Sequence, residues 1–315
     1  MKQQNQAHRW AVILAGGVGT RLRKLTRAVS GDDRPKQFCP IIGDKTLLEQ
    51  TQRRVDLLFK FDQTFVVLTR KHERFFKEIL NECTADRLLI QPENKGTAAA
   101  VLLSLLRIAQ ISPQGVVAFF PSDHHFTEEE RFMSEVRMAV DLVEAEPSLI
   151  TLLGVTPEHS EEQYGWIEPV KCSVTHDEQR FFRVRRFWEK PSRNVAQRLM
   201  HAGALWNTFV MVGHVKTLLD IISRTLPDLY RALSSAGDIL GSRKEEELLS
   251  GIYSSIPSTN FSTEVLSRRP GLLSVLKLSD VGWTDLGEPH RVASTIQLTQ
   301  GHTQPRALSL LLSET

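Results

Sequence analysis

Cysteine and long apolar segments are both scarce in this chain of 315 residues. It holds three cysteines, Cys39, Cys83 and Cys172, which are far apart and form no C-x-x-C pair, so a disulfide framework is not indicated. No run approaches the roughly 20 apolar residues of a membrane span. The segment 1–9 is polar and lacks the apolar core of a signal peptide. We therefore expect buried, reduced thiols and a cytoplasmic protein that does not enter a membrane.

An excess of charge of one sign is also missing. The 39 Lys and Arg residues nearly balance the 37 Asp and Glu residues, which gives a formal net charge of +2. That charge is too small to indicate binding to nucleic acid or to an anionic membrane surface. The length suffices for one large α/β domain, and the hydrophobic content of 41% is ordinary for a globular protein. The partners that we expect are small molecules.

The first half of the chain alternates between strand-like and helix-like segments. Strands are predicted at 10–14, 64–68, 87–90, 116–120 and 149–154, and helices at 46–59, 71–80, 97–109 and 128–144. Repeated strand–helix units imply parallel strands with right-handed crossovers and helices on both faces of the sheet. The fold class expected from this pattern is therefore α/β.

The second half is less regular. Strands are predicted at 164–170, 180–188, 209–212 and 272–278, and helices at 192–201, 215–233 and 244–252. No linker rich in Pro, Gly or Ser separates the halves, so we predict one domain over 1–300 with a short C-terminal extension at 301–315. The apolar stretch 307–312 is suited to docking on this chain or on a second copy, which would make a homodimer.

A glycine-rich loop follows the first predicted strand. The sequence Leu14-Ala15-Gly16-Gly17-Val18-Gly19-Thr20-Arg21 matches neither the G-x-x-x-x-G-K-[ST] phosphate loop nor the G-x-G-x-x-G dinucleotide turn. Glycines nevertheless let backbone N–H groups approach a polyphosphate. Arg21 adds a forked cation, and Lys36 a compact one. Three glycines alone would favour a simple tight turn, and these cations favour a phosphate site.

Polar loops also follow the third and fourth predicted strands, where ligands bind in open α/β sheets. The loop Gln91 to Thr97 could read a base edge, or could be only a connection and helix cap. Asp123, within Pro121 to His125, suits Mg²⁺, although it could instead cap the next helix. The adjacent histidines also allow zinc, but no third ligand has a supporting spacing.

Two later segments match what a second, anionic substrate would need, and a third adds an acid. Tyr164 to Glu168 combines an aromatic–glycine turn with a strand. Glu189-Lys190 ends a strand with an acid for hydroxyl groups and a cation for phosphate, and Asp285 offers a second carboxylate. Each alone could be a turn or a solvated charge pair. Together they give two separated acids, three strong cations and a glycine loop in one α/β chain.

Seven short motifs, which follow one another along the chain in the order of a known family, establish a resemblance to that family. They are LAGGVGTRL (14–22), RPKQF (34–38), FPSDHHF (120–126), YGWIE (164–168), FWEKP (187–191), LWNTFV (205–210) and WTDLG (283–287). From about residue 10 to 292 the chain resembles the sugar-1-phosphate nucleotidylyltransferases, most closely the mannose-1-phosphate guanylyltransferases. The resemblance implies a Rossmann-like, mixed but mostly parallel sheet. It also implies a nucleotide-binding half at about 8–155 and a sugar-binding half at about 156–300.

The resemblance further implies a reaction in which a sugar 1-phosphate attacks the α-phosphorus of a bound NTP and expels pyrophosphate. The residues implied to bind the nucleotide are Leu14, Ala15, Gly16, Gly17, Gly19, Thr20, Lys95, Gly96, Thr97 and Ser122. The cations implied to act in catalysis are Arg21, Lys36 and Lys190. The groups implied to bind the sugar phosphate are Gly165, Glu189, Lys190 and Asn207. The residues implied to hold the Mg²⁺ cofactor are Asp123 and Asp285.

The sequence departs from the guanylyltransferase pattern at three places. Arg23-Lys24 replaces Trp-Pro, Lys95 to Ala100 reads KGTAAA instead of RNTAPA, and Asn260-Phe261 replaces Asp-Tyr. These differences bear on the base and the sugar more than on the reaction class. The expected reaction is GTP plus mannose 1-phosphate to GDP-mannose. The alternatives are another NDP-sugar specificity and a non-catalytic nucleotide-sugar-binding regulator; a nicotinamide-dependent dehydrogenase would need the dinucleotide fingerprint that is missing here.

Overall fold

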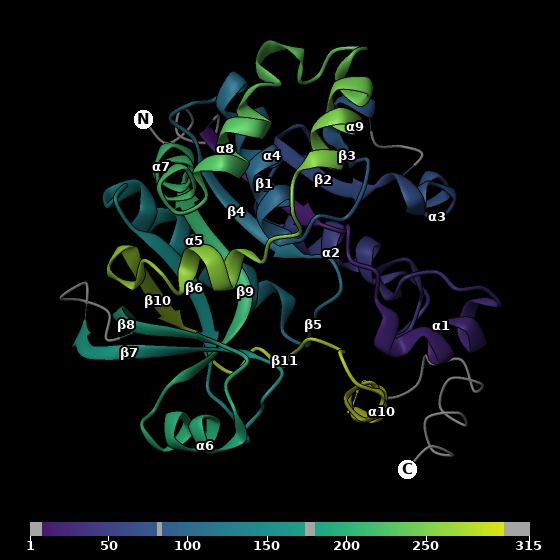
Figure 1. Cartoon of the computed structure of the whole chain (residues 1–315). Coiled ribbons are helices and arrows are strands. Elements are labelled where there is room, and N and C mark those ends of the chain that lie inside the picture. The colour runs from purple at the N-terminus through teal and green to yellow at the C-terminus, as the bar shows by residue number, and fades with distance from the viewer. Residues whose placement is uncertain (1–7, 81–83, 174–179, 299–315) are drawn as a thin grey trace.

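The computed structural model describes residues 8–80, 84–173 and 180–298 and is built around one nine-stranded sheet (Figure 1). The strand order is β3-β2-β1-β4-β9-β6-β10-β8-β7. The strands span, in chain order, β1 Arg9–Leu14, β2 Thr64–Thr69, β3 Leu88–Gln91, β4 Val116–Pro121, β6 Ile150–Val155, β7 Gly165–Ser173, β8 Phe181–Glu189, β9 Leu205–His214 and β10 Leu273–Lys277. A separate two-stranded sheet pairs β5 (His125–Phe126) with β11 (Trp283–Thr284).

The sheet is mixed, with one dominant direction. Strands β1 to β4 are mutually parallel, and β6, β7 and β10 run the same way, whereas β8 and β9 run against them. Every residue of β2 and of β4 is buried, as expected of parallel strands covered on both faces. The predicted α/β class with a mixed, mostly parallel sheet is confirmed. The carboxyl ends of β1, β2 and β4 lie together at one edge, which is where the glycine loop begins.

The two faces of the sheet each carry a hydrophobic core. Along β1, Trp10 and Val12 face one core, and Ala11 and Ile13 face the other, because successive side chains of a strand alternate. The helices that contribute to the first core are α4 Thr97–Ile111, α7 Val215–Thr225, α8 Pro227–Ser234 and α9 Glu245–Ser255. Those that contribute to the second are α2 Leu47–Val55, α3 Glu73–Ile79 and α5 Glu129–Ala145. Helix α6 (Arg193–His201) packs beside β7 in a small aromatic cluster.

Two helices are absent from the sequence-based prediction. Helix α1 (Arg23–Ser30) buries only Leu25 and Thr26, so its apolar stripe is too narrow to be recognised. Helix α10 (Pro289–Leu298) follows the second acidic motif. Both pack into a third cluster through Leu22, Leu25, Val292 and Ile296. The segment between the glycine loop and β2 is thereby joined to the last helix of the described chain.

Several predicted boundaries are wrong. The helix predicted over 46–59 ends at Val55, and the strand predicted over 209–212 is the middle of β9, which starts at Leu205. Leu152 pairs with Met211 and Gly154 with Asn207, so β9 has extra residues around Phe209 that interrupt its alternation. The helix after Asp123 begins at Glu129, with Glu128 at its cap, so Asp123 is not a helix cap.

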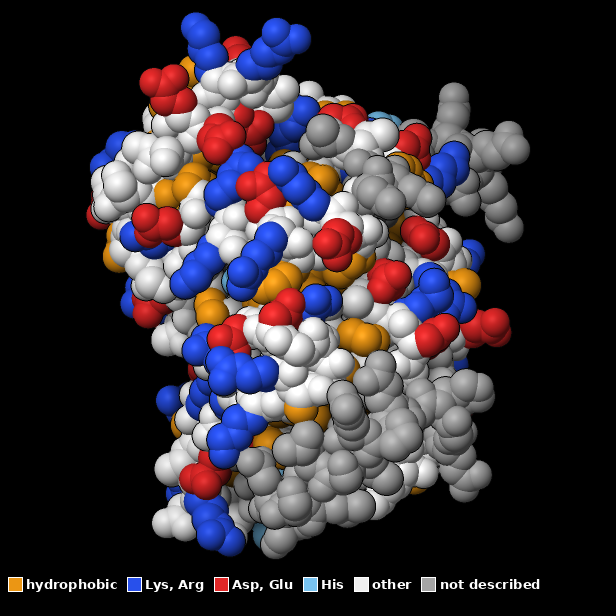
Figure 2. All heavy atoms as spheres, turned by 90° about the vertical axis from the view of Figure 1, so that its right-hand side faces the viewer, with side chains coloured by type: hydrophobic (Ala, Val, Ile, Leu, Met, Phe, Trp, Pro, Cys, Tyr) orange, Lys and Arg blue, Asp and Glu red, His pale blue; other side chains and the backbone are white. Residues whose placement is uncertain are grey.

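The surface of the protein carries charges of both signs (Figure 2), and its one described thiol is buried. On the face that Figure 2 shows, Lys and Arg side chains are interspersed with Asp and Glu side chains. Among the described residues, no helix combines the length and apolarity needed to span a membrane. Cys39 is buried and unbridged, and burial raises the pKa of its thiol. The segment 301–315 and Cys83 lie outside the described residues, so the predicted extension and homodimer remain predictions.

Candidate active site

The glycine loop leaves β1 with its carbonyl groups turned toward the protein. The buried amide of Gln37 donates to Ala15 O at 3.0 Å and to Gly17 O at 2.7 Å, and the Asn94 amide donates to Gly16 O at 3.0 Å. Within the described part of the chain, none of the backbone N–H groups from Gly16 to Gly19 donates a hydrogen bond. Successive free N–H groups form an anion-binding concavity. The loop therefore has unused donors of the kind that a phosphate group needs.

Two of the three loop glycines have little room for a side chain. Gly19 has a φ of +60°, and a Cβ there would lie 3.0 Å from the backbone nitrogen of Lys36. A Cβ on Gly16 would lie 3.0 Å from Thr69 Oγ1 and 3.1 Å from Gln91 Nε2. Gly17 has open space instead. The loop is thus packed between the ends of β2 and β3 on one side and the Lys36 segment on the other.

A cavity of about 410 Å³ opens beside this loop. The predicted nucleotide or metal residues that line it are Leu14, Gly16, Gly17, Gly96, Thr97, Ser122 and Asp123. The other lining groups, which were not predicted as site residues, include Gln37, Gln91, Asn94, Phe209, Ser258 and Asn260. The last three come from the second half of the chain. The cavity is therefore shared by both halves.

The loop before α4 is fixed by hydrogen bonds to a distant segment. Thr259 O accepts from Ala98 N at 3.1 Å, and Thr97 Oγ1 accepts from Phe261 N at 2.9 Å. Gly96 has a φ of +82°, and a Cβ there would overlap Thr259 O. The glycine that departs from the guanylyltransferase pattern is thus required by this close approach of two backbones.

Lys36 joins the two acidic motifs. It lies in the 3₁₀ turn η3 (Lys36–Phe38), is 8% exposed, and donates from Nζ to Asp285 O at 2.6 Å and to Leu286 O at 3.2 Å. The same ammonium lies 3.2 Å from Asp123 Oδ2. One buried cation therefore brings the end of β4 and the segment after β11 together, although they are 162 positions apart in sequence.

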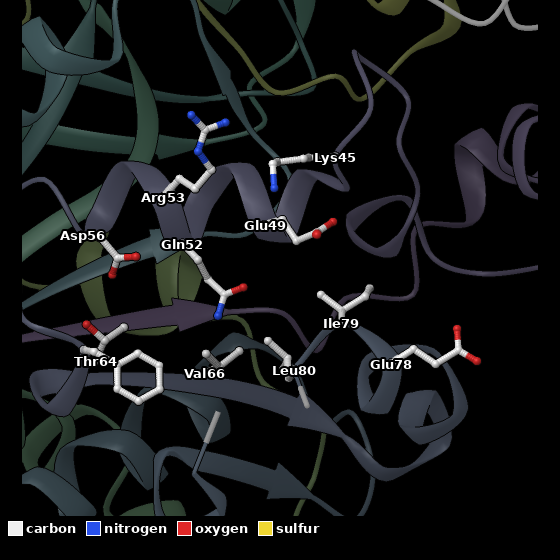
Figure 3. Close-up of a pocket in the computed structure, with 11 residues that line it drawn as sticks. Lys45, Glu49, Gln52, Arg53, Asp56, Thr64, Val66, Glu78, Ile79 and Leu80 are labelled. Carbon is white, nitrogen blue, oxygen red and sulfur yellow. The ribbon is translucent and has the colours of Figure 1, made fainter. Parts of the chain in front are cut away.

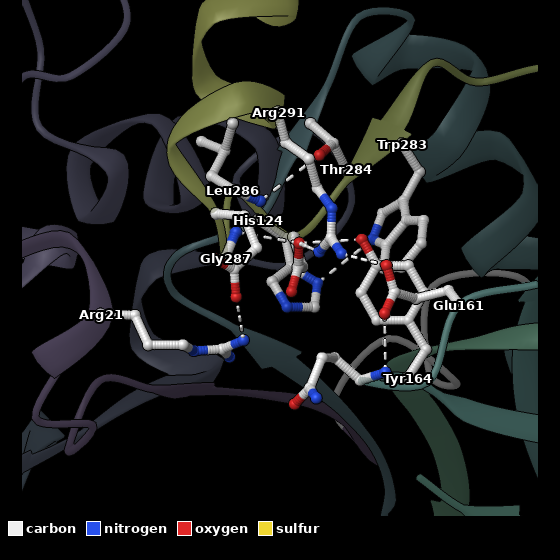
Figure 4. A network of polar contacts seen from close by, with 12 residues as sticks. Arg21, His124, Glu161, Tyr164, Trp283, Thr284, Leu286, Gly287 and Arg291 are labelled. Carbon is white, nitrogen blue, oxygen red and sulfur yellow. Dashed lines mark hydrogen bonds and ion pairs between the residues drawn. The ribbon is translucent and has the colours of Figure 1, made fainter. Parts of the chain in front are cut away.

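Asp285 is held as a charged carboxylate within a polar network that includes Tyr164, Gly287 and Arg291 (Figure 4). Its Oδ1 accepts from Tyr164 Oη at 2.9 Å, from Gly287 N at 2.9 Å and from Arg291 Nη1 at 2.6 Å. Burial works to raise the pKa of Asp285, but His124 and the cations Arg291 and Lys36 outweigh it and lower the pKa to about 2. The Asp285 side chain is consequently ionised at neutral pH.

The paired histidines do not build a metal centre. Burial lowers the pKa of His124, and Trp283 Nε1 donates to its Nδ1 at 3.1 Å. Burial likewise lowers the pKa of His125 to about 4, and both its ring nitrogens lack a hydrogen-bond partner within the structure as described. The described ranges contain no group of three or more His, Cys, Asp or Glu side chains that could hold a metal ion. The zinc alternative thus gains no third ligand.

The predicted sugar-side residues meet on neighbouring strands. Gly165 pairs with Glu189 across β7 and β8, and a Cβ on Gly165 would lie 3.2 Å from Glu189 Oε2 and 3.3 Å from Asn207 Cβ. Burial raises the pKa of Glu189, against the lowering influence of Lys190 and of a hydrogen bond with Asn260. Phe209 has a φ of +63°, and its N–H donates to Asn207 Oδ1 at 3.2 Å, so a local kink in β9 orients that amide.

Three predicted cations are not gathered around the cavity. Arg21 lies in the 3₁₀ turn η2 (Thr20–Leu22) and forms an ion pair with Glu288 at 2.9 Å. Lys95 pairs with Glu93 at 3.2 Å. Lys190 is exposed, directly follows β8 and has a φ of +45°, which is uncommon for a residue with a side chain. These side chains would have to reorient to reach phosphate.

Sequence reasoning missed Gln37, Asn94, Tyr164 and Arg291 as site residues. The first three lie inside segments that it singled out, where the motif itself was a usable signal. Arg291 belongs to the unpredicted helix α10, so nothing in the local pattern marked it.

A second hollow of about 570 Å³ lies between α2, β2 and α3 (Figure 3). It is lined by oppositely charged side chains such as Arg53, Asp56 and Glu78, and by none of the predicted site residues. Thr64, in its wall, is the first residue of β2, so this hollow lies at the amino end of that strand. Because ligands in open α/β sheets bind at the carboxyl ends, the smaller cavity is the candidate site.

The family model described as nucleotidyl transferase matches residues 10–300. The chain belongs to the nucleotidyl transferase family. The resemblance seen in its motifs is therefore confirmed at the level of the family.

Named relatives of this nucleotidyl transferase include the mannose-1-phosphate guanylyltransferase 2 of Escherichia coli O157:H7. The two are 28% identical over 290 residues, which cover 88% of this chain and 58% of the relative. The chain thus spans somewhat more than half the length of that curated relative.

Solved structures extend the comparison to the fold. A mannose-1-phosphate geranyltransferase from Thermus thermophilus superposes with a TM-score of 0.75 at 28% identity, covering 91% of this chain and 79% of the other. A putative glucose-1-phosphate thymidylyltransferase from Bacillus anthracis, crystallised with sucrose, has a TM-score of 0.53 at 14% identity, covers 95% of this chain and 98% of the other, and supports the fold alone.

Proposed function

We propose that this chain joins GTP and mannose 1-phosphate into GDP-mannose and releases pyrophosphate. The observation that carries the proposal is the contact of one buried cation, Lys36, with both acidic segments at the edge of the cavity that the glycine loop lines. Nucleotidyl transfer needs positioning and charge neutralisation more than proton transfer. A preformed set of loop donors, one cation and two acids suits that requirement.

On this proposal the nucleotide occupies the 410 Å³ cavity, with its phosphates at the free N–H groups of Gly16 to Gly19. The loop at Gly96 and Thr97, with the backbone of Leu14 and Ala15 and with Ser122, lies against the base and ribose. Thr20 helps to hold the triphosphate, Arg21 and Lys36 neutralise its charge, and Arg21 exchanges Glu288 for a phosphate oxygen. The half at 8–155 is the nucleotide-binding part, with Phe209, Ser258 and Asn260 completing its cavity.

The sugar 1-phosphate enters on the proposal from the side of β7 to β9. Gly165 leaves room for the sugar ring, and Glu189 and Asn207 accept from or donate to its hydroxyl groups. Lys190 and the Lys36 ammonium orient its phosphate. A phosphate oxygen forms a new bond to the α-phosphorus as the bond to the β-phosphate breaks, and the electron pair leaves with pyrophosphate. No side chain needs to act as a general base in this exchange.

The two carboxylates beside Lys36, those of Asp123 and Asp285, fit a magnesium ion. Mg²⁺ is usually bound through one or two carboxylates together with substrate phosphates and water. Asp285 is ionised, with a pKa of about 2, and Asp123 is partly exposed in the cavity wall, so these two residues would hold it. When bound, Mg²⁺ would act there as a Lewis acid and template for the phosphates.

The test is release of pyrophosphate with Mg²⁺ over a panel of nucleoside triphosphates and sugar 1-phosphates. GTP with mannose 1-phosphate is expected to be the best pair. Another pair would replace the specificity but keep the reaction class, and no turnover with any pair would leave a binding protein.

Asp123→Asn separates the enzyme from the non-catalytic alternative. We expect kcat to fall by about 100-fold or more, because charge stabilisation at transferring phosphates amounts to several kcal/mol. Asp228→Asn, which removes an exposed carboxylate on α8, is the matched control and is expected to leave kcat unchanged. Retention of full turnover in Asp123→Asn would contradict the assigned role.

A further inference from the structure

Arg291, which was not predicted as a site residue, makes two ion pairs and an aromatic contact beside the site. It lies in the first turns of α10, with only 10% of its side chain exposed. Its Nη1 donates to Asp285 Oδ1 at 2.6 Å, and its Nη2 donates to Glu161 Oε2. The guanidinium carbon also lies 4.6 Å from the centre of the Tyr164 ring (Figure 4). One cation therefore contacts Asp285, close to it in sequence, and the loop of Glu161 and Tyr164, which lies more than 120 positions earlier.

The two carboxylates on Arg291 would repel each other without it. Asp285 and Glu161 are each 13% exposed, so solvent screens them poorly. Lys36 and His124 also face Asp285, and His159 Nε2 lies 3.5 Å from Glu161 Oε2. Among these groups Arg291 is the one that bonds to both acids. Removal of Arg291 would leave the two carboxylates buried near each other without the cation that they share.

Glu161 also anchors the loop between β6 and β7. A carboxylate oxygen of Glu161 accepts from Gln163 N at 2.7 Å, and its carbonyl accepts from Trp166 Nε1 at 2.8 Å. This loop ends at Tyr164, whose hydroxyl donates to Asp285, and continues into Gly165 beside Glu189. Arg291 consequently connects Asp285 with the loop that presents Tyr164 and Gly165.

We propose that Arg291 is a positioning residue that fixes Asp285 and the loop of Glu161, Tyr164 and Gly165 in one arrangement before the second substrate binds. This inference rests on the proposed function, in which Asp285 serves the phosphates and Gly165 the sugar. It assigns Arg291 no contact with substrate. Among the described residues, no hydrogen bond, ion pair or ring contact joins Arg291 to the glycine loop or to the Gly96 segment, so the first substrate is expected to bind nearly as before.

The experiment compares Arg291→Met and Arg291→Lys with wild type in the purified full-length chain. In Arg291→Met we expect KM for the sugar 1-phosphate to rise about tenfold or more, with KM for the nucleoside triphosphate changed less than about threefold. Mn²⁺ alone, titrated by electron paramagnetic resonance, is expected to bind about tenfold more weakly, because loss of a partner that orients a metal ligand typically costs that much. Arg291→Lys keeps the charge but not the fork, and is expected to fall between the two.

A double variant tests the reason for these effects. Arg291→Met/Glu161→Gln removes the unpaired acid together with the cation, so it is expected to recover part of both the sugar-phosphate KM and the Mn²⁺ affinity. Arg231→Met, which removes an exposed arginine of α8, is the matched control and is expected to behave as wild type. Melting temperatures of all variants identify any that fail to fold. In that case Glu161→Gln alone, which keeps the ion pair between Arg291 and Asp285, is compared with wild type.

The inference is overturned if Arg291→Met keeps wild-type values for the sugar-phosphate KM and for Mn²⁺, or if both KM values rise equally. An absence of recovery in the double variant also overturns it, because repulsion between the two acids would then play no part. The proposed function fails separately, through a wild-type chain that turns over no substrate pair. The Mn²⁺ titration still distinguishes the variants in that case.

Discussion

The two sides of the candidate site are built in different ways. On the side proposed for the nucleotide the protein offers backbone: N–H groups of the glycine loop that donate no hydrogen bond among the described residues, with the loop carbonyls occupied by Gln37 and Asn94. On the side proposed for the second substrate it offers side chains: Asp285, Arg291, Glu161 and Tyr164, held to each other by ion pairs and hydrogen bonds. The first is a short segment with fixed shape, and the second is an assembly of charges from distant segments.

This difference predicts different sensitivities. A backbone site fails when an added atom displaces the chain, whereas a charge assembly fails when one member loses its partner or changes protonation. Lys36 belongs to both, because its backbone nitrogen faces Gly19 and its ammonium faces the two acids. Substitutions at residues other than Lys36 can therefore be chosen that affect one side of the site and leave the other intact.

The largest effect is expected from Gly96→Ala on the backbone side. The new Cβ would overlap Thr259 O in a backbone conformation with φ of +82°, so we expect a loss of about 3 kcal/mol or more in unfolding free energy. Gly203→Ala is the matched control, because φ there is +79° but no atom lies within 4 Å of the new Cβ. It is expected to cost about 1 kcal/mol. Equal losses in denaturant titrations would show that the contact with Thr259 does not matter.

A second effect is expected when the pH is lowered, because protonation of His125 should reduce the stability of the side of the site that is built from side chains. This residue pairs with Thr284 between β5 and β11, the strands next to Asp123 and Asp285. Its folded pKa of about 4 lies below the ordinary 6.5, so the unfolded chain binds more protons between these values. Stability contributed by neutral His125 is therefore complete above pH 6.5 and is lost as the pH falls toward 4. At pH 5 the loss is expected to be about 2 kcal/mol.

Denaturant titrations at pH 7 and pH 5 measure this dependence. His125→Leu is expected to flatten it by about the same amount, whereas His201→Leu, at an exposed histidine of α6, is expected to leave it unchanged. An identical pH dependence in His125→Leu and wild type would exclude His125 as its source.

The smallest effect is expected from Gln37→Leu, which returns to the backbone side. Loss of its two hydrogen bonds to the loop carbonyls is expected to cost about 1–2 kcal/mol and to weaken nucleotide binding about tenfold. Gln50→Leu is the matched control, because that amide donates to Ile42 O and Lys45 O at 2.7 and 2.9 Å, away from the cavity. It should lower stability to a similar degree but keep the nucleotide affinity, which a thermal-shift titration measures. Equal nucleotide affinities in the two variants would mean that Gln37 does not shape the loop.

Elements with a strong apolar pattern were predictable. β1, β2, β4 and α4 lie where the sequence predicts them to within two residues, since buried runs of Val, Ile, Leu and Phe have few other structures available. β9 was predicted too short because its kink at Phe209 interrupts the alternation. α1 and α10 were missed because each helix has few buried apolar residues, which makes its helical pattern weak. Both helices are instead held by contacts within one shared hydrophobic cluster.

The sequence by itself determined the α/β class, the glycine loop at the end of β1, and the polar residues that follow the strands, because local spacing and strand direction suffice for these. The identity of the two acids and of Lys36 was also readable from motifs. Only the tertiary structure decided that Lys36 joins Asp123 to the Asp285 segment, and that Arg291 holds Asp285 against Glu161. More than a hundred positions separate Asp123 from Asp285, and Asp285 from Glu161, and their arrangement depends on how the sheet and α10 pack, which no local pattern encodes.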